Sequence, residues 1–279
     1  MSEAGKVVLV TGASSGLGAS TARYLASRGM RVFGTSRRGG DGDDRAAGAA
    51  GGDAFPILKL DVRDDGSVLH CVRSVVEEAG RLDVLVNNAG CMLAGAVEET
   101  TIDEAMEEFQ TNFFGAARMI RAVLPHMRDQ GAGQIINIGS LGSMVGLPYM
   151  AYYSASKSAL LLLSEGLRQE VRGFGVAVSV IEPGDFKTQM TFNVQHVRGG
   201  LAVYEAARRR AVSIMGKNEQ KGGDPIELAR LVHRLVGTRR PRLVYRVGAE
   251  AFWLPIVRVL APASLFEAGV RRLYRVDQH

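Results

Sequence analysis

The two side chains best suited to proton chemistry are Tyr153 and Lys157. Lys157 stands four positions after Tyr153, so the two share one face of a helix. A free phenol has a pKa near ~10 and is a weak base at neutral pH, but a fixed positive charge nearby lowers that pKa. The pair predicts a tyrosine that gives and takes a proton near working pH. Taken alone, the same spacing also fits an exposed surface pair. Tyr149 and Tyr152 lack such a partner, because Tyr153 and Ser156 stand four positions after them.

A glycine-rich turn at residues 11–18 directly follows an apolar run at Val7–Val10. Gly12 permits a tight turn, Gly16 lets backbone approach a pyrophosphate, and Gly18 permits close helix packing. The helix that begins there offers free N–H groups to phosphates. The spacing is G-x-x-x-G-x-G, and a glycine turn without any ligand is the alternative. The contacts expected from this turn are Gly12, Ser14, Ser15, Gly16, Leu17 and Gly18.

The residues that follow the apolar run at 31–35, the second predicted strand, indicate which nicotinamide cofactor the glycine turn would bind. An acidic residue there would bond the adenosine 2′-hydroxyl and repel a 2′-phosphate. This chain has Ser36 at that place, followed by Arg37 and Arg38. Arginine binds a phosphate dianion through paired, charge-assisted hydrogen bonds. The sequence therefore predicts NADP(H) in preference to NAD(H), with arginines that merely cap an exposed loop as the alternative.

The elements that must position these residues follow from an alternation of short apolar runs with longer amphipathic ones. Strands are predicted at residues 7–10, 31–35, 57–60, 84–86, 134–138, 176–181 and 243–246, and helices at 17–28, 67–79, 102–127 and 151–172. Such alternation implies parallel pairing with right-handed crossovers, and apolar strands imply helices on both faces. We expect an α/β fold: a doubly wound, mostly parallel seven-stranded sheet of Rossmann type, with its ligand crevice at the strands' carboxyl ends.

Three segments fall outside this repeat, within what we expect to be a single nucleotide-binding domain over residues 1–279. Residues 39–53 are rich in Gly, Ala and Asp and predict a flexible loop. Residues 186–223 form an insertion that we expect to act as a lid over the substrate pocket. Residues 250–279 predict a basic, amphipathic, helical tail. Peripheral contact with a membrane surface and packing onto the catalytic domain or a neighbouring subunit remain equally open for this tail.

Composition narrows the functional classes. The net charge is +5, but no nucleic-acid-binding motif accompanies it, so we expect no nucleic-acid partner. Two cysteines, Cys71 and Cys91, fit neither a disulfide framework nor a zinc site. No two histidines have helical ligand spacing, so no metal site is expected. No apolar signal segment or bilayer-spanning stretch stands out, and we expect a cytoplasmic protein.

Over about residues 5–190, the motifs together resemble those of the short-chain dehydrogenase/reductase family. Besides the glycine turn and the pair at positions 153 and 157, they comprise Asn87-Asn88-Ala89-Gly90, Asn112, Ser140 and Pro183-Gly184, in the family's order. One departure is Gly139 before Ser140, where the family often has a second serine.

The resemblance implies four catalytic residues: Asn112, Ser140, Tyr153 and Lys157. The Ser140 hydroxyl would hold the substrate oxygen beside the phenol. Asn112 would hold a water that links Lys157 to solvent. Lys157 would also bond the nicotinamide ribose.

The resemblance further implies contacts with the cofactor. Asn88 would line the cofactor channel and stabilise the fourth strand, Thr188 would touch the carboxamide, and Asp61 would bind the adenine amino group. Beyond the glycine turn, the expected contacts are Ser36, Arg37, Arg38, Asp61, Val62, Asn88, Ala89, Gly90, Tyr153, Lys157, Pro183, Gly184 and Thr188.

Residues 141–149 approach Tyr153, are largely apolar and contain no arginine to hold a carboxylate. The amino-acid sequence of this segment, together with that of residues 181–184, resembles the branch of the family that contains 17β-hydroxysteroid and retinol dehydrogenases. The resemblance implies a bulky apolar ketone, aldehyde or alcohol, and a polyketide-like substrate is equally open. Met150, Met190 and Phe192 are candidates for the pocket wall or for plain core.

Members of the family usually pair their two long helices between subunits, so the resemblance implies a homodimer or homotetramer. A different class of function is also open: a catalytically silent NADP(H)-binding redox sensor or scaffold. Proteins of that kind commonly lack the tyrosine or the lysine, whereas this chain has Tyr153 and Lys157.

Overall fold

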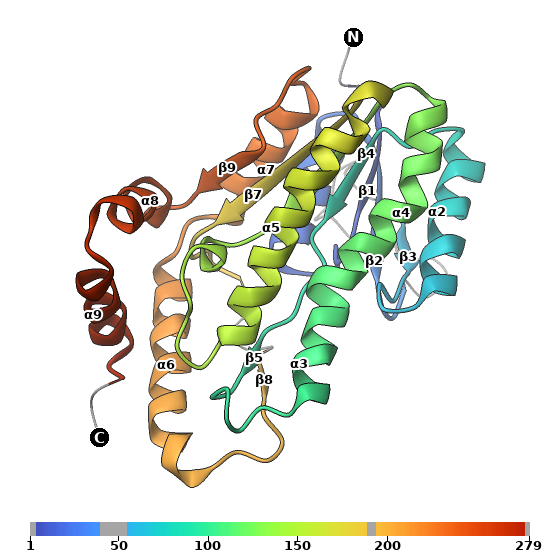
Figure 1. Cartoon of the computed structure of the whole chain (residues 1–279). Coiled ribbons are helices and arrows are strands. Elements are labelled where there is room, and N and C mark those ends of the chain that lie inside the picture. Colours follow the sequence, from blue (N-terminus) through green and yellow to red (C-terminus); the bar gives the residue numbers. More distant parts are fainter. Residues whose placement is uncertain (1–3, 40–54, 189–193, 277–279) are drawn as a thin grey trace.

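The computed structural model describes residues 4–39, 55–188 and 194–276, and its centre is a seven-stranded sheet (Figure 1). The strand order is β3-β2-β1-β4-β6-β7-β9, and every neighbouring pair is parallel. This confirms the predicted doubly wound fold, with strand ends within two residues of those expected. Residues 40–54, most of the predicted loop, lie outside the described residues. The strands are β1 (Val7–Val10), β2 (Arg31–Ser36), β3 (Ile57–Lys59), β4 (Val84–Asn87), β6 (Gly133–Ile138), β7 (Val176–Pro183) and β9 (Val244–Val247).

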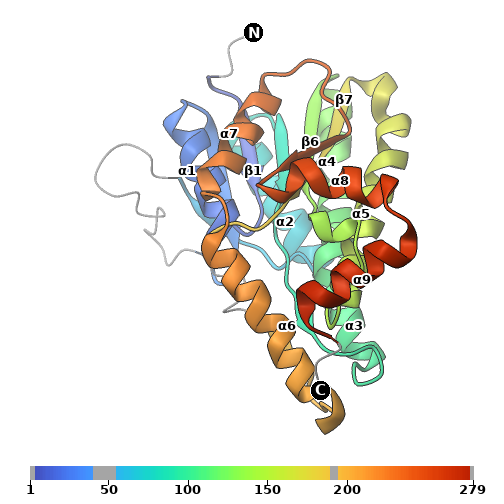
Figure 2. The same ribbon diagram turned by 90° about the vertical axis from the view of Figure 1, so that its left-hand side faces the viewer.

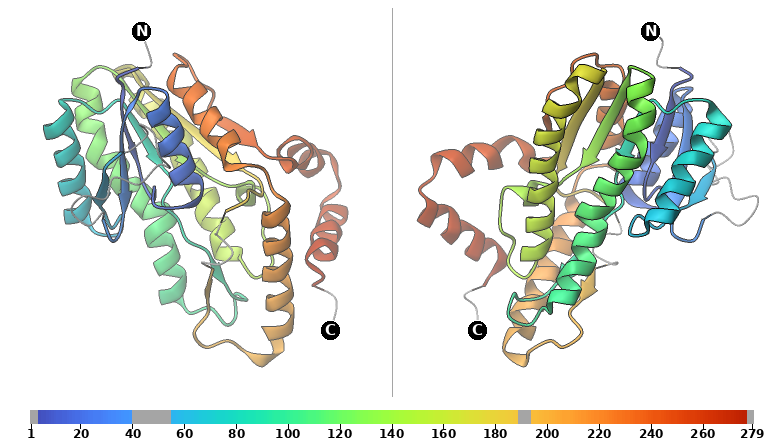
Figure 3. Two further views of the ribbon diagram at one scale, coloured as in Figure 1. Left: turned by 180° about the vertical axis from the view of Figure 1, so that it is seen from behind. Right: turned by 45° about the vertical axis from the view of Figure 1, so that its right-hand side comes forward.

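Helices cover both faces of the sheet (Figures 2 and 3). One face packs against α2 (Asp65–Ala79), α4 (Gly115–Asp129) and α5 (Ala151–Val171), and the other against α1 (Gly16–Ser27) and α7 (Pro225–Val236). Successive strand residues point to opposite faces, so every strand must be apolar on both sides. The helix α7 was not among the elements predicted from the sequence.

The helix predicted over 102–127 is not one uninterrupted α-helix. It begins as α3 (Ile102–Phe109), widens into a π-helical turn at Gln110–Phe114, and continues as α4. A π-helical turn inserts one extra residue and is common at functional sites. Here it contains Asn112, whose buried side chain faces α5.

The two segments outside the repeat form further helices. The insertion contributes β8 (Gln195–His196), which pairs with β5 (Leu93–Ala94), and the long helix α6 (Ala202–Lys221). The tail forms α8 (Glu250–Leu260) and α9 (Ala263–Tyr274). The role of the insertion as a lid stays a prediction. Among the helices that the structure describes, none is both long and apolar enough to cross a membrane.

The first turn of α1 packs tightly against the end of β4, because Gly18 has no side chain. A Cβ on Gly18 would lie 2.4 Å from Asn88 Nδ2 and 2.4 Å from the Gly12 carbonyl oxygen. The Gly12 carbonyl belongs to the glycine turn, and the Asn88 side chain follows β4. The shape of the turn therefore depends on the absence of a side chain at Gly18.

We expect Gly18→Ala to destabilise the protein by roughly 1–3 kcal/mol, the usual cost of overpacking, and to weaken binding of the nicotinamide cofactor. The matched control is Gly166→Ala in α5, where a Cβ meets nothing within 4 Å. Alanine should stabilise that helix by about 0.5–1 kcal/mol. Thermal unfolding of both variants is the measurement, and equal shifts in the same direction would contradict the packing argument.

Candidate active site

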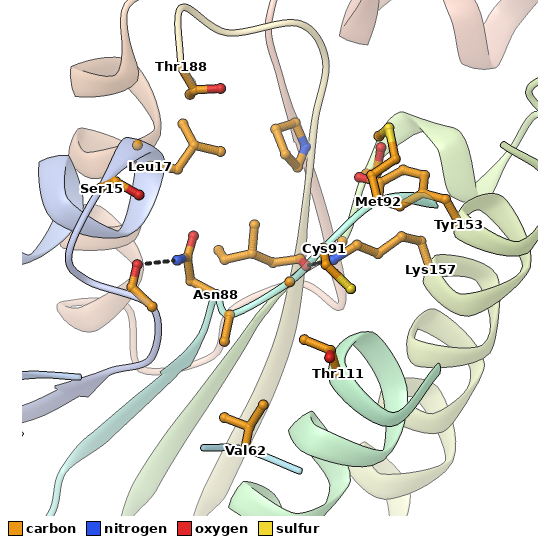
Figure 4. A pocket seen from close by; sticks show the side chains of 18 of the residues that line it. Ser15, Leu17, Val62, Asn88, Cys91, Met92, Thr111, Tyr153, Lys157 and Thr188 are labelled. Carbon is orange, nitrogen blue, oxygen red and sulfur yellow. Dashed lines mark hydrogen bonds between the residues drawn. The ribbon is translucent and has the colours of Figure 1, made fainter. Parts of the chain in front are cut away.

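A cavity of about 570 Å³ opens at the carboxyl ends of the central strands (Figure 4). This volume suits a small molecule or cofactor. Of the site residues predicted from the sequence, all but Gly18 and Asn112 line it. After the roles expected of them, we name the end of the cavity at the turn before α1 the phosphate-binding end and the end at Tyr153 the substrate end.

The glycine turn leaves the start of α1 open to the cavity. Gly12 and Gly16 have φ angles of +66° and +56°, a conformation that favours glycine. Ser15 occupies the N-cap position without making a side-chain cap, and the first turn contains no acidic residue. The exposed N–H groups and the positive end of the helix dipole therefore suit a phosphate. In Figure 4, Ser15 and Leu17 lie at this end, with Thr188 across from them.

Asn88 fastens the turn to the end of β4. Its Nδ2 donates to the carbonyl oxygens of Thr11 (2.9 Å) and Gly12 (3.2 Å). In return, the Thr11 hydroxyl accepts from the backbone N–H groups of Asn88 and Ala89, each at 2.9 Å. Asn88, which was expected to line the cofactor channel, lines the cavity and also holds the turn in shape.

Three arginines gather at the phosphate-binding end. Arg37 and Arg38 are exposed, line the cavity and form no salt bridge with a residue that the structure describes. The Asp61 carboxylate, expected to bind an adenine amino group, pairs with Arg63 at 2.7 Å. The Arg63 guanidinium holds the pKa of Asp61 below its usual value. Arg63 also lines the cavity and was missed in the sequence, where an Arg two positions after Asp61 carries no distinctive spacing.

Tyr153 and Lys157 are both about 95% buried, each with 5% of its surface exposed. The interpretation as an exposed surface pair is therefore wrong. Lys157 Nζ donates to the Ile138 carbonyl oxygen at 3.0 Å and lies 5.8 Å from the centroid of the Tyr153 ring. Figure 4 shows both side chains reaching from α5 toward Cys91 and Met92.

The prediction that Lys157 lowers the pKa of Tyr153 is wrong for this structure. Burial raises the pKa of Tyr153 to about 12, and a hydrogen bond with Ser140 only partly opposes this. The acidic neighbours Glu108 and Asp185 raise the same pKa further. Burial lowers the pKa of Lys157 to about 8. Loss of hydration is the largest cause of both shifts, and neither side chain is among the causes of the other's shift.

Asn112 lies behind the cavity wall. Its Oδ1 accepts from the Cys91 backbone N–H at 2.9 Å, and its Nδ2 donates to the Cys91 carbonyl at 2.9 Å and to Ser156 Oγ at 3.1 Å. These three bonds tie the segment after β4 to α5. Asn112 thus fixes the wall beside Lys157, and its expected hold on a water stays a prediction.

Glu108 is a buried carboxyl beside the site that sequence reasoning missed. One carboxylate oxygen accepts from the Leu93 backbone N–H at 3.1 Å, while the other has no hydrogen-bond partner in the described structure. Burial raises the pKa of Glu108 to about 7, and its charge acts on both Lys157 and Tyr153. Its position one helical turn before Asn112 was the available signal.

The substrate end contains residues from remote parts of the chain. Met215 and Glu219 come from α6, and Tyr274 comes from α9. Asp185 lies beside them, and burial, followed by the charges of nearby carboxylates, raises its pKa to about 6. No spacing in the sequence could have linked these positions to Tyr153.

Of the three candidates for the pocket wall or the core, Met150 belongs to the core. It is buried in one cluster with Tyr153 and is not part of the cavity lining. Met190 and Phe192 lie outside the described residues. Thr188 lines the cavity and also bonds the Glu219 carboxylate.

We expect Glu108→Gln to raise the stability of the protein at pH 8, with an advantage that shrinks toward pH 5. The pKa of Glu108 is about 7 in the folded protein against an ordinary value of 4.5. The folded state therefore holds the extra proton between these values, and stability is lost as pH rises through them. Glutamine keeps the bond to Leu93 without the charge.

The measurement is the thermal unfolding midpoint across pH 5–8. The control is Glu165→Gln on the exposed side of α5, which should show no such trend. A difference between Glu108→Gln and the parent that is constant across this range would exclude the ionisation of Glu108 as the cause.

Comparison with known proteins agrees with this geometry. Residues 6–198 match the family model described as short chain dehydrogenase. A 3-ketodihydrosphingosine reductase of Bacteroides thetaiotaomicron is 36% identical over 97% of this chain and 98% of its own length. The bovine retinol dehydrogenase 8 is 30% identical over 96% of this chain and 85% of its own.

A solved structure supports the same assignment. The crystal structure of a short-chain dehydrogenase from Streptomyces avermitilis is 36% identical and superposes with a TM-score of 0.80, covering 99% of this chain and 98% of that one. Fold, motifs and relatives agree over nearly the whole length. The chain therefore belongs to the short-chain dehydrogenase/reductase family and is an oxidoreductase that acts on CH–OH or C=O groups.

Proposed function

We propose that this enzyme uses NADP(H) to interconvert a bulky apolar ketone or aldehyde with its alcohol, with Tyr153 as the general acid and base. The observation that carries the proposal is one cavity with a phosphate-binding turn at one end and the buried Tyr153 at the other. A molecule that spans the cavity would bring a bound cofactor to the phenol.

The residues present fit a dinucleotide with a 2′-phosphate. The open start of α1 suits the pyrophosphate, and Arg37, Arg38 and Arg63 surround the place where the second strand ends. No acidic residue ends that strand to repel a phosphate. When bound, the nicotinamide supplies or accepts the hydride.

Tyr153 is suited to carbonyl reduction in particular. With its pKa raised to about 12, the phenol stays protonated at neutral pH and can give its proton to a developing alkoxide. Ser140, hydrogen-bonded to Tyr153, stands where its hydroxyl can hold the same oxygen. Lys157, whose Nζ donates to the Ile138 carbonyl at the end of β6, lines the same cavity, which supports its proposed bond to a ribose hydroxyl.

The substrate end favours an apolar molecule. Beside the carboxyls of Asp185 and Glu219, its lining includes the apolar or aromatic side chains of Met92, Leu147, Phe186, Met215 and Tyr274. Relatives described as a 3-ketodihydrosphingosine reductase and a retinol dehydrogenase support a lipid-like ketone or alcohol. Steroid-, retinoid- and polyketide-like ketones all belong to the class proposed.

We also propose a cytoplasmic enzyme that assembles as a homodimer or homotetramer. Exposed apolar side chains on the two long helices, Phe114 and Leu162, support pairing through them.

The cofactor preference is tested by steady-state kinetics with NADPH and NADH. We expect kcat/KM to favour NADPH, and Arg37→Ala to lower it by roughly ten- to a hundredfold with NADPH, because a charge-assisted bond is worth about 1.5–3 kcal/mol. With NADH the same variant should change little. Arg73→Ala, an exposed arginine on α2 outside the cavity lining, is the control. A parent enzyme that favours NADH would overturn the assignment.

The proton step is tested by Tyr153→Phe, assayed on a panel of apolar ketones by NADPH absorbance. Loss of the phenol should lower kcat by about 10²–10⁴, while NADPH still binds. Tyr152→Phe removes a neighbouring hydroxyl from the same helix and should leave kcat within about twofold of the parent. Full activity in Tyr153→Phe would refute the mechanism.

A further inference from the structure

The helix α8 displays an apolar face that nothing in the described structure covers. Six large apolar side chains of this helix are exposed, and the structure buries no residue of α8. At 100° per residue, the six fall on one arc of about 160°, with Arg258 on the opposite side. The six are Phe252, Trp253, Ile256, Val257, Val259 and Leu260.

This apolar face belongs to an arm at the edge of the molecule, formed by α8 and α9. Figures 1 and 3 show α8 and α9 standing away from the sheet, joined by a short turn. Arg258 lies over the Phe266 ring at 4.9 Å and links the two helices. The inner end of α9 buries Tyr274 in the cavity wall, so the arm is anchored to the substrate end.

The arm is also basic. Arg271, Arg272 and Arg275 are exposed at the end of α9, whereas the acidic residues described on the two helices are Glu250 and Glu267. Aromatic and aliphatic side chains beside arginines are the composition of a helix that lies in a membrane interface. Anionic headgroups attract arginines near the surface.

We propose that the outer face of α8, together with the arginines of α9, docks on the surface of a bilayer that contains anionic lipid. Charge complementarity favours this occupant over a second copy of the chain. If two copies met through this arm, their positively charged arginines would repel one another, in a protein whose net charge is already +5.

The chain carries a direct reporter of this docking, because its single tryptophan is Trp253. In the full-length protein Trp253 is 47% exposed. Vesicles of phosphatidylcholine with phosphatidylserine should shift its fluorescence to the blue, and brominated lipids should quench it. Vesicles of phosphatidylcholine alone should act more weakly, and added salt should weaken the response to the anionic ones.

A matched pair of substitutions separates the arm from the rest of the surface. Val259 on α8 and Val203 on α6 are equally exposed, at 78%. Val259→Glu should weaken vesicle binding about tenfold or more, because a charge would replace an aliphatic group that docking buries in the membrane. Val203→Glu should bind as the parent does. Thermal unfolding of both variants shows that each is folded.

Several outcomes would overturn the proposal. One is the absence of any fluorescence change with either vesicle, and another is equal loss of binding in both variants. A blue shift that appears without vesicles and rises with protein concentration, together with a doubled mass in light scattering, would assign the face to a second copy. These readouts do not depend on turnover, so they stand apart from a failure of the proposed reaction.

Discussion

The burial of the Lys157 ammonium is the constraint on which the site depends. A desolvated charge is costly unless polar atoms surround it. The carbonyl of Ile138 meets this need because β6 ends there, leaving that oxygen free to accept from Nζ. Asn112 holds the facing cavity wall through its hydrogen bonds to Cys91 and Ser156. Asn112 itself lies in the π-helical turn between α3 and α4.

Negative charge rather than positive charge dominates the surroundings of Tyr153. Glu108 and Asp185 lie near enough to raise its pKa, and both are themselves pushed toward the neutral form by burial. Near neutral pH these carboxyls are therefore partly protonated, and each can change charge with small shifts in its environment. The phenol is thus tuned by groups that are not in the motif by which the family is recognised.

Sequence reasoning succeeded where local pattern determines structure. Apolar periodicity and glycine spacing predicted the sheet, and the motif residues reached one cavity because parallel strands end at one edge. It failed where the determinant is tertiary. The pKa of Tyr153 depends on burial, and Tyr274 enters the cavity from α9, remote in sequence from Tyr153. Arg63 was missed for a different reason, because its pair with Asp61 is local but has no distinctive spacing. Local periodicity also cannot distinguish one π-helical turn within a long amphipathic helix.

The position of Tyr274 has a consequence for how the enzyme is made. The phosphate turn, the arginines and the proton-transfer residues all lie before β7, so they leave the ribosome before β7, α7 and β9 do. The wall that Tyr274 supplies is synthesised after all of these, in the final turn of α9. The residues expected to hold the phosphates and to transfer the proton therefore leave the ribosome before Tyr274 does, and a chain shortened before α9 would lack the part of the substrate wall that Tyr274 supplies.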